Sequence, residues 1–107
     1  MKPFVFARAA RDDLDSIGNY LLGNVPLDAA LRIVESIETQ VSRLAGNPEI
    51  GHKRQDLGDE SLRYWLVERR YLIIYRNTSE ALEVVRIVHG ARDIAALIGE
   101  DAQGTRG

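Results

Sequence analysis

The fold of this chain is decided by residues 62–98, which read LRYWLVERRYLIIYRNTSEALEVVRIVHGARDIAALI. Three short runs rich in Leu, Val, Ile, Tyr and Trp are separated here by polar segments at residues 68–70 and 77–80. Short apolar runs between turn-forming residues predict a three-stranded antiparallel meander. The run from Tyr71 to Tyr75 is apolar throughout, which predicts a central strand that is buried on both faces.

Two helices are predicted upstream of this stretch. Apolar residues recur at helical spacing from Ala9 onward until Gly23-Asn24, and a wider apolar stripe covers about Leu27 to Leu44. Gly46-Asn47-Pro48 is a strong stop signal for the second helix. Before both helices, residues 3–7 predict an edge strand, because Pro3 cannot donate a hydrogen bond to a sheet.

This order of elements predicts an α+β fold, β-α-α-β-β-β, in which an N-terminal edge strand and a helical hairpin pack on a small antiparallel sheet. The apolar run Asp93 to Ile98 predicts a short C-terminal helix. We expect residues 1–98 to form one domain and residues 99–107 to form a disordered tail. The aromatic residues of the predicted sheet are expected in its core: Tyr64, Trp65, Tyr71 and Tyr75.

Composition excludes several classes of function. The 107 residues include no cysteine, so neither a disulfide framework nor a thiol nucleophile is possible. No apolar run is long enough for a membrane span, and no signal-peptide pattern opens the chain, which predicts a cytoplasmic protein. The net charge is −2, but residues 52–92 hold eight Lys/Arg and six Asp/Glu, so the predicted sheet half is mildly basic. A local basic groove for an acidic partner remains possible.

Residues 48–61, PEIGHKRQDLGDES, form a long segment without a helical or strand period. The segment carries Gly51-His52-Lys53-Arg54, the densest basic cluster of the chain. A loop of this length in a small domain is often functional, but a solvated connection explains the pattern equally well.

Few residues are candidates for catalysis. There is no P-loop, dinucleotide fingerprint, HExxH motif or nucleophile elbow, and two histidines are too few for a typical histidine metal site. We therefore expect no metal and no cofactor. His89 stands at a predicted strand end beside Gly90 and is a candidate general base. Packing or capping of the turn is the alternative role that we favour for His89.

The arginines are the more informative set. Arg63, Arg76 and Arg86 lie in or at the end of predicted strands, with Arg54 and Arg92 nearby in sequence. An arginine fork binds phosphate or carboxylate groups through two parallel hydrogen bonds, so five arginines could line an anion-binding concavity. Pairing with acidic residues of neighbouring strands, for example Glu83 or Glu68, is the alternative, and the sequence leaves both open.

Five blocks of sequence form a recognisable set. They are Ala9-x-x-Asp12-Asp13-Leu14-x-x-Ile17-x-x-Tyr20, Asn47-Pro48-x-x-Gly51-x-x-Arg54, Leu62-Arg63, Tyr71-Leu72-Ile73-Ile74-Tyr75-Arg76 and Val85-Arg86-Ile87-Val88-His89-Gly90-Ala91-Arg92-Asp93-Ile94. These blocks resemble the ParE/RelE toxin family of bacterial type II toxin–antitoxin modules, and the likeness spans about residues 4–98. The resemblance implies a growth-inhibiting toxin that is silenced by a cognate, ParD-like antitoxin whose C-terminal segment wraps around it.

The resemblance also implies one of two targets. RelE-like members cleave mRNA in the ribosomal A site with several basic residues, and ParE-like members block DNA gyrase without catalysing a reaction themselves. Leu72 and Trp65 stand where the nuclease branch has basic residues, and only Arg63 and Arg92 match its basic positions. A chain of net charge −2 is also a poor ligand for phosphate-rich RNA. The block HGARDI resembles the ParE side more closely.

The leading hypothesis is therefore a gyrase-blocking toxin that is not an enzyme. Its target- and antitoxin-binding residues would be Arg54, Arg63, Arg76, Arg86 and Arg92. The alternative is a ribosome-dependent endoribonuclease whose candidate catalytic residues are Arg54, Arg63, His89 and Arg92. A third hypothesis is a degenerate toxin that only binds its antitoxin.

Overall fold

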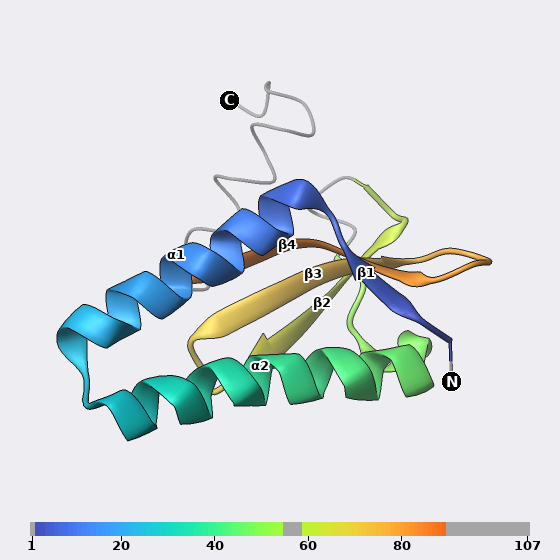
Figure 1. Ribbon diagram of the computed structural model, residues 1–107. Helices are drawn as coiled ribbons and strands as arrows, with labels where there is room; N and C mark the ends of the chain where they lie inside the picture. The colour runs from blue at the N-terminus through green and yellow to red at the C-terminus, as the bar shows by residue number, and fades with distance from the viewer. Residues whose placement is uncertain (1, 55–58, 90–107) are drawn as a thin grey trace.

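The computed structural model describes residues 2–54 and 59–89 of the chain (Figure 1). The elements follow in the order β1 (Phe4–Phe6), α1 (Arg8–Asn24), α2 (Leu27–Gly46), the 3-10 helix η1 (Pro48–Ile50), β2 (Leu62–Val67), β3 (Tyr71–Asn77) and β4 (Leu82–His89). The predicted α+β fold with the order β-α-α-β-β-β is confirmed. The predicted C-terminal helix at residues 93–98 and the predicted tail at residues 99–107 lie outside the described residues.

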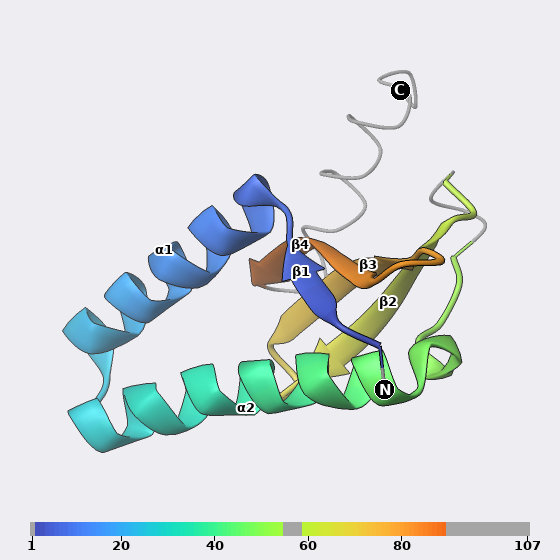
Figure 2. The ribbon, with the colours of Figure 1, turned by 45° about the vertical axis from the view of Figure 1, so that its right-hand side comes forward.

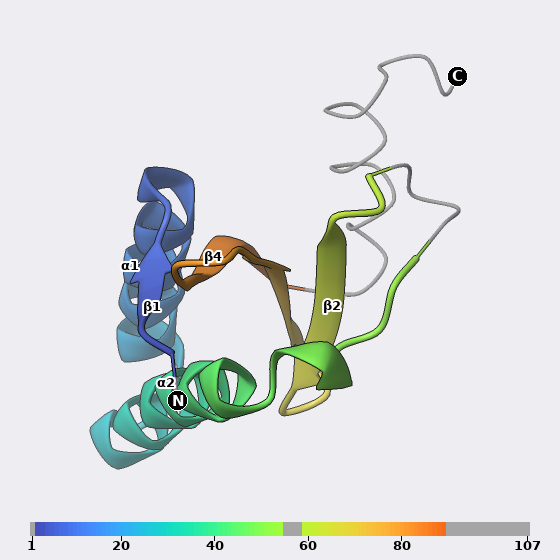
Figure 3. The same cartoon turned by 90° about the vertical axis from the view of Figure 1, so that its right-hand side faces the viewer.

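The strands form one four-stranded sheet in the order β1-β4-β3-β2, with β1 and β2 at its opposite edges (Figure 3). Strands β2, β3 and β4 form the expected antiparallel meander, in which Val67 faces Tyr71 and Tyr71 faces His89. Strand β1 is an edge strand, as expected, but it pairs parallel to β4, so the sheet is mixed. Parallel pairing is possible here because both helices lie between β1 and the meander in the chain and supply the long connection that it needs.

The two helices form a V whose arms meet at the short connection between them (Figure 2). Helix α1 ends where the Val25 N–H donates to the carbonyl oxygen of Leu21 at 2.9 Å, and Pro26 then adopts extended backbone before α2. Helix α2 runs two residues past the predicted Leu44, and the Asn47 N–H closes it on the carbonyl oxygens of the last turn. The predicted helices are therefore confirmed, with ends displaced by one or two residues.

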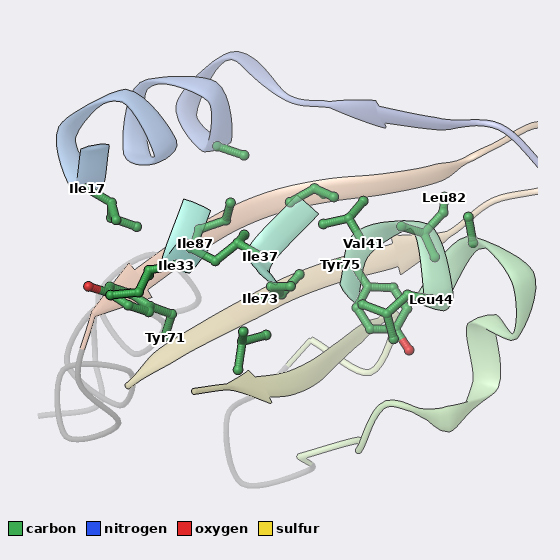
Figure 4. Close-up of a cluster of buried hydrophobic side chains, with 14 of the residues drawn as sticks. Ile17, Ile33, Ile37, Val41, Leu44, Tyr71, Ile73, Tyr75, Leu82 and Ile87 are labelled. Carbon is green, nitrogen blue, oxygen red and sulfur yellow. The ribbon is translucent and has the colours of Figure 1, made fainter. Parts of the chain in front are cut away.

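The hydrophobic core lies between the helices and the sheet (Figure 4). Five of the six apolar positions predicted for the α2 stripe are buried there, and the sixth, Val34, is half-buried: the buried five are Ala30, Ile33, Ile37, Val41 and Leu44. Burial of this stripe against Tyr71, Ile73 and Tyr75 removes large apolar surfaces from water, which is the main force that holds helix and sheet together.

Strand β3 is buried on both of its faces, as the sequence predicts. Tyr71, Ile73 and Tyr75 belong to the core under the helices, whereas Leu72 and Ile74 belong to a second, smaller cluster on the other face. The alternation of strand side chains assigns the two sets to opposite faces. Across the described residues, neither helix has the length and apolar character that a membrane crossing requires.

Candidate functional site

Arg63 and Tyr75 hold the segment that follows α2. The Tyr75 hydroxyl donates to the carbonyl oxygen of Pro48 at 2.6 Å and accepts the Gly51 N–H at 2.9 Å. The Arg63 guanidinium donates to the carbonyl oxygens of Glu49 at 3.1 Å and Gly51 at 2.9 Å. Burial raises the pKa of Tyr75 above its ordinary value, although the Gly51 N–H and the Arg63 charge act in the opposite direction. Arg63, a predicted anion ligand, is thus bonded to the protein backbone.

Gly51 is required by this arrangement, because a Cβ atom at this position would overlap the hydroxyl and ring of Tyr75. The next residue, His52, forms an antiparallel bridge with Tyr64 on the free edge of β2, through hydrogen bonds of 2.9 and 2.8 Å. Lys53 and Arg54 follow as exposed residues. The basic cluster that the sequence singles out therefore projects beside the β2 edge.

Arg86 connects β4 to α1. Its guanidinium forms a two-point hydrogen bond with the Asp13 carboxylate, at 2.7 Å from Nε and 2.9 Å from Nη2. The same carboxylate accepts the Ile87 N–H at 2.9 Å. Because both side chains are largely buried, charge-assisted bonds of this geometry are among the strong ones in the fold. Arg86 thereby fixes the position of α1 on the sheet.

Arg76 takes part in a more exposed network. Its guanidinium lies 3.1 Å from a Glu83 carboxylate oxygen, 3.3 Å from the Ser61 hydroxyl and 3.8 Å from Asp59. The Ser61 hydroxyl and backbone N–H, with a smaller effect of Arg76, lower the pKa of Asp59. The sequence left two roles open for Arg76, anion binding and pairing with an acidic residue of a neighbouring strand, and the structure shows the pairing with Glu83. Exposed pairs of this kind contribute little to stability.

The predicted anion-binding arginines do not converge on one site within residues 2–54 and 59–89. Arg63 is paired with Tyr75 across β2 and β3, so its side chain lies on the same face of the sheet as Tyr75. Arg76 is the next residue after Tyr75 and projects from the opposite face. Arg86 turns toward α1, and Arg54 is exposed beside β2. Arg92, the fifth candidate, lies outside the described residues.

An open pocket of about 250 Å³ lies between α1 and the end of the sheet. Ser16, Ile17 and Tyr20 form its α1 side, and Tyr71 and His89 form its sheet side. The His89 ring stacks on the Tyr71 ring with centroids 4.9 Å apart, and the Tyr20 ring lies 6.3 Å from His89. Burial raises the pKa of the Tyr71 phenol above its ordinary value. The candidate general base His89 is thus one wall of an aromatic pocket.

A second aromatic cluster lies where α2 meets β2. The Trp65 indole N–H donates to the Gln40 side chain at 2.9 Å, and the Arg43 guanidinium lies 5.5 Å from the centre of the Trp65 ring. The His52 ring stacks beside Trp65 at 6.2 Å. These contacts account for the half-buried Trp65 as a packing residue between helix and sheet. Among the described residues, no group of three potential ligands is placed to bind a metal ion.

Comparison with known proteins identifies the family. The family described as the ParE toxin of type II toxin–antitoxin system, parDE, matches residues 4–94. The chain belongs to the ParE toxin family. The chain is also similar to a solved structure titled chromosomal ParDE TA system from P. aeruginosa, with a TM-score of 0.71 and 24% identity over 84% of this chain and 97% of that chain. No match was found among the curated proteins.

Membership of the ParE toxin family confirms the resemblance inferred from the five sequence blocks and makes this chain a toxin of the toxin–antitoxin class. Two residues of these blocks have contacts that sequence reasoning missed. Asp13 was not among the candidate residues, yet its carboxylate accepts hydrogen bonds from Arg86 and the Ile87 N–H. Tyr20 does not share the helical spacing of Ala10, Ile17 and Leu21, the buried residues of α1, and this offset was the available signal that Tyr20 faces the pocket and not the core.

Proposed function

We propose that this ParE-family toxin arrests growth by binding DNA gyrase in the cytoplasm, without bond chemistry of its own, and that a ParD-type antitoxin silences it. The observation that carries the proposal is the separation of the candidate catalytic residues. Arg63 faces Tyr75 across β2 and β3, whereas His89 faces Tyr71 across β3 and β4. The two residues are therefore about 13 Å apart along the strands and about 10 Å apart across them.

A general acid or base must lie within hydrogen-bond reach of the proton that it moves, and a charge stabiliser must reach the same phosphate. The spacing of Arg63 and His89 does not support such a pair. Arg63 is also bonded to two backbone carbonyl oxygens, and the His89 ring is stacked on Tyr71. These contacts favour binding and structural roles for both residues over hydrolysis of RNA.

Supercoiling of relaxed plasmid by purified gyrase tests the proposal. We expect the antitoxin-free toxin to stop supercoiling, and we expect preincubation with the ParD-type antitoxin to restore it. The control is the chain carrying Ile37→Asp, which should not fold and should not inhibit. Normal supercoiling at a large molar excess of folded toxin would contradict the gyrase target.

The two other candidate functions predict different results for the same purified or induced toxin. A ribosome-dependent endoribonuclease would cut mRNA at codon-defined positions on translating ribosomes, and Arg63→Ala would abolish these cuts with the fold intact. A degenerate toxin would bind its antitoxin but permit normal growth when it is induced without antitoxin.

A further inference from the structure

The pocket between α1 and the end of the sheet has the features of an anchor site for one side chain. Its floor is the buried Tyr71 ring, and its walls are Ile17, His89 and the ring of Tyr20, which is 57% exposed. A volume of about 250 Å³ lies below the range of about 300–1,000 Å³ that is usual for small-molecule sites. A pocket of this size and openness suits a single large apolar side chain, the kind of contact that dominates protein–protein interfaces.

The ring positions add a directional preference. The Tyr71 and His89 rings are stacked, and Tyr20 is tilted by 45° to His89. Aromatic groups attract one another in offset-stacked or edge-to-face arrangements with centroids about 4.5–7 Å apart. An aromatic side chain from a partner can therefore pack against the exposed residues Tyr20 and His89, whereas a charged side chain would lose its hydration there.

The neighbouring β2–β3 turn supplies positive charge. Glu68 and Arg69 both have positive φ, 57° and 61°, so the turn is held in a conformation that non-glycine residues rarely adopt. Arg69 and Arg70 are exposed at this turn, and Glu68 pairs with Arg32 at 3.5 Å. Burial raises the pKa of Tyr71 and the charge of Arg70 acts in the opposite direction, which places the Arg70 cation near the Tyr71 hydroxyl at the pocket floor.

The opposite rim of the pocket has a different character. Asp12 and Asp15 are exposed on α1 just before Ser16, and Asp13 is bonded to Arg86. A partner carboxylate is therefore repelled from the α1 rim and attracted to the turn. This charge difference favours a partner segment whose acidic side chain lies toward the β2–β3 turn and not toward α1.

We propose that this pocket binds the antitoxin through one large apolar side chain, aromatic by preference, with an acidic side chain of the same segment paired to Arg70. The inference rests on the proposed function, since it takes the ParD-type antitoxin as the partner. It assigns the anchor to the α1–sheet pocket rather than to the five arginines that the sequence singled out.

Binding of the purified antitoxin to the full chain, measured by isothermal titration calorimetry, tests this assignment. Tyr20→Ala should weaken binding about 10- to 100-fold, as truncation of a buried interface anchor does. Arg70→Glu should weaken it about tenfold, and the loss should shrink as salt concentration rises. The matched controls are Leu31→Ala, an apolar residue of similar exposure on α2, and Arg8→Glu at the start of α1. Both controls should change the dissociation constant less than about twofold.

Both test residues are exposed, so all variants should keep the wild-type melting temperature. Wild-type affinity in Tyr20→Ala would overturn the assignment while leaving the toxin–antitoxin pair intact. Failure of the wild-type chain to bind any ParD-type antitoxin would remove the proposed partner and the inference with it. A toxin dimer that is lost in Tyr20→Ala would assign the pocket to a second copy instead. Restoration of Arg70→Glu binding by an acidic-to-lysine change in the antitoxin would identify the paired residue.

Discussion

Removal of one buried oxygen, the hydroxyl of Tyr75, tests how the segment after α2 is held on the sheet. In Tyr75→Phe the ring remains in the core, but Pro48 loses a donor and the Gly51 N–H loses its acceptor. The Gly51 N–H is buried, and a buried donor without a partner costs about 1–3 kcal/mol. The lost bond to the Pro48 carbonyl adds about 1 kcal/mol.

We therefore expect Tyr75→Phe to lower the free energy of unfolding by about 2–4 kcal/mol. For a domain of this size the corresponding fall in melting temperature is about 10–25 °C. Urea denaturation followed by circular dichroism measures the change, and Tyr20→Phe, which removes an exposed hydroxyl, is the matched control. The control should remain within about 0.5 kcal/mol of wild type.

A double-mutant cycle with Arg63→Ala shows whether the two side chains act on the same segment. Both hold residues 48–51, so their effects should be non-additive by about 1 kcal/mol. Additive effects, or a Tyr75→Phe variant as stable as wild type, would refute the reasoning. If Arg63 acts by positioning this segment, Tyr75→Phe should also reduce toxicity in parallel with Arg63→Ala.

Four further changes test the fold. Ile37→Asp places a charge at a fully buried position and should abolish cooperative melting, at a cost of at least about 3 kcal/mol; a retained sharp transition would show that the α2 stripe is misplaced. Asp13→Ala removes the acceptor of three hydrogen bonds and should lower the urea midpoint by the equivalent of about 2–3 kcal/mol, whereas an unchanged midpoint would contradict the link between α1 and β4. Glu68→Asn combined with Arg69→Gly should raise the free energy of unfolding by about 1 kcal/mol, because asparagine and glycine adopt positive φ more readily than the residues they replace. A lower urea midpoint would count against strain at this turn. Burial raises the pKa of Tyr71, so the protonated phenol stabilises the folded state fully below the ordinary value of 10.0, and this stabilisation should fall as pH rises through the higher folded pKa. Absorbance at 295 nm follows the titration, and an ordinary tyrosine titration without unfolding would contradict this prediction.

The fold class could be read from local patterns because each element carries its own period. The α2 stripe and the apolar run of β3 predict their burial, since 3.6-residue and two-residue periods project side chains onto defined faces. The parallel pairing of β1 with β4 could not be read in this way. Nothing local in residues 4–6 distinguishes a parallel from an antiparallel neighbour, and the choice depends on where α1 and α2 direct the chain.

For the functional residues too, local sequence pattern predicted one part and the tertiary structure decided the rest. The five sequence blocks identified the family, and they contain Arg63, Arg86, Tyr20 and His89. The sequence could not tell an arginine that faces an open groove from one bonded within the domain. Glu49 and Gly51, which accept from Arg63, lie 12 or more residues from it in the chain, and Asp13 lies 73 residues from Arg86, so these contacts form only after folding.

The sequence by itself determined the family, the order of the elements and the core stripe of each helix, because these depend on residue types at short, regular spacing. Only the tertiary structure decided that Asp13 holds Arg86, that Arg63 and Tyr75 hold residues 48–51, and that Tyr20, Tyr71 and His89 enclose a pocket. Each of these contacts joins distant segments, and their geometry is set by the packing of α1 and α2 on the sheet. Long-range packing therefore decided the candidate binding site.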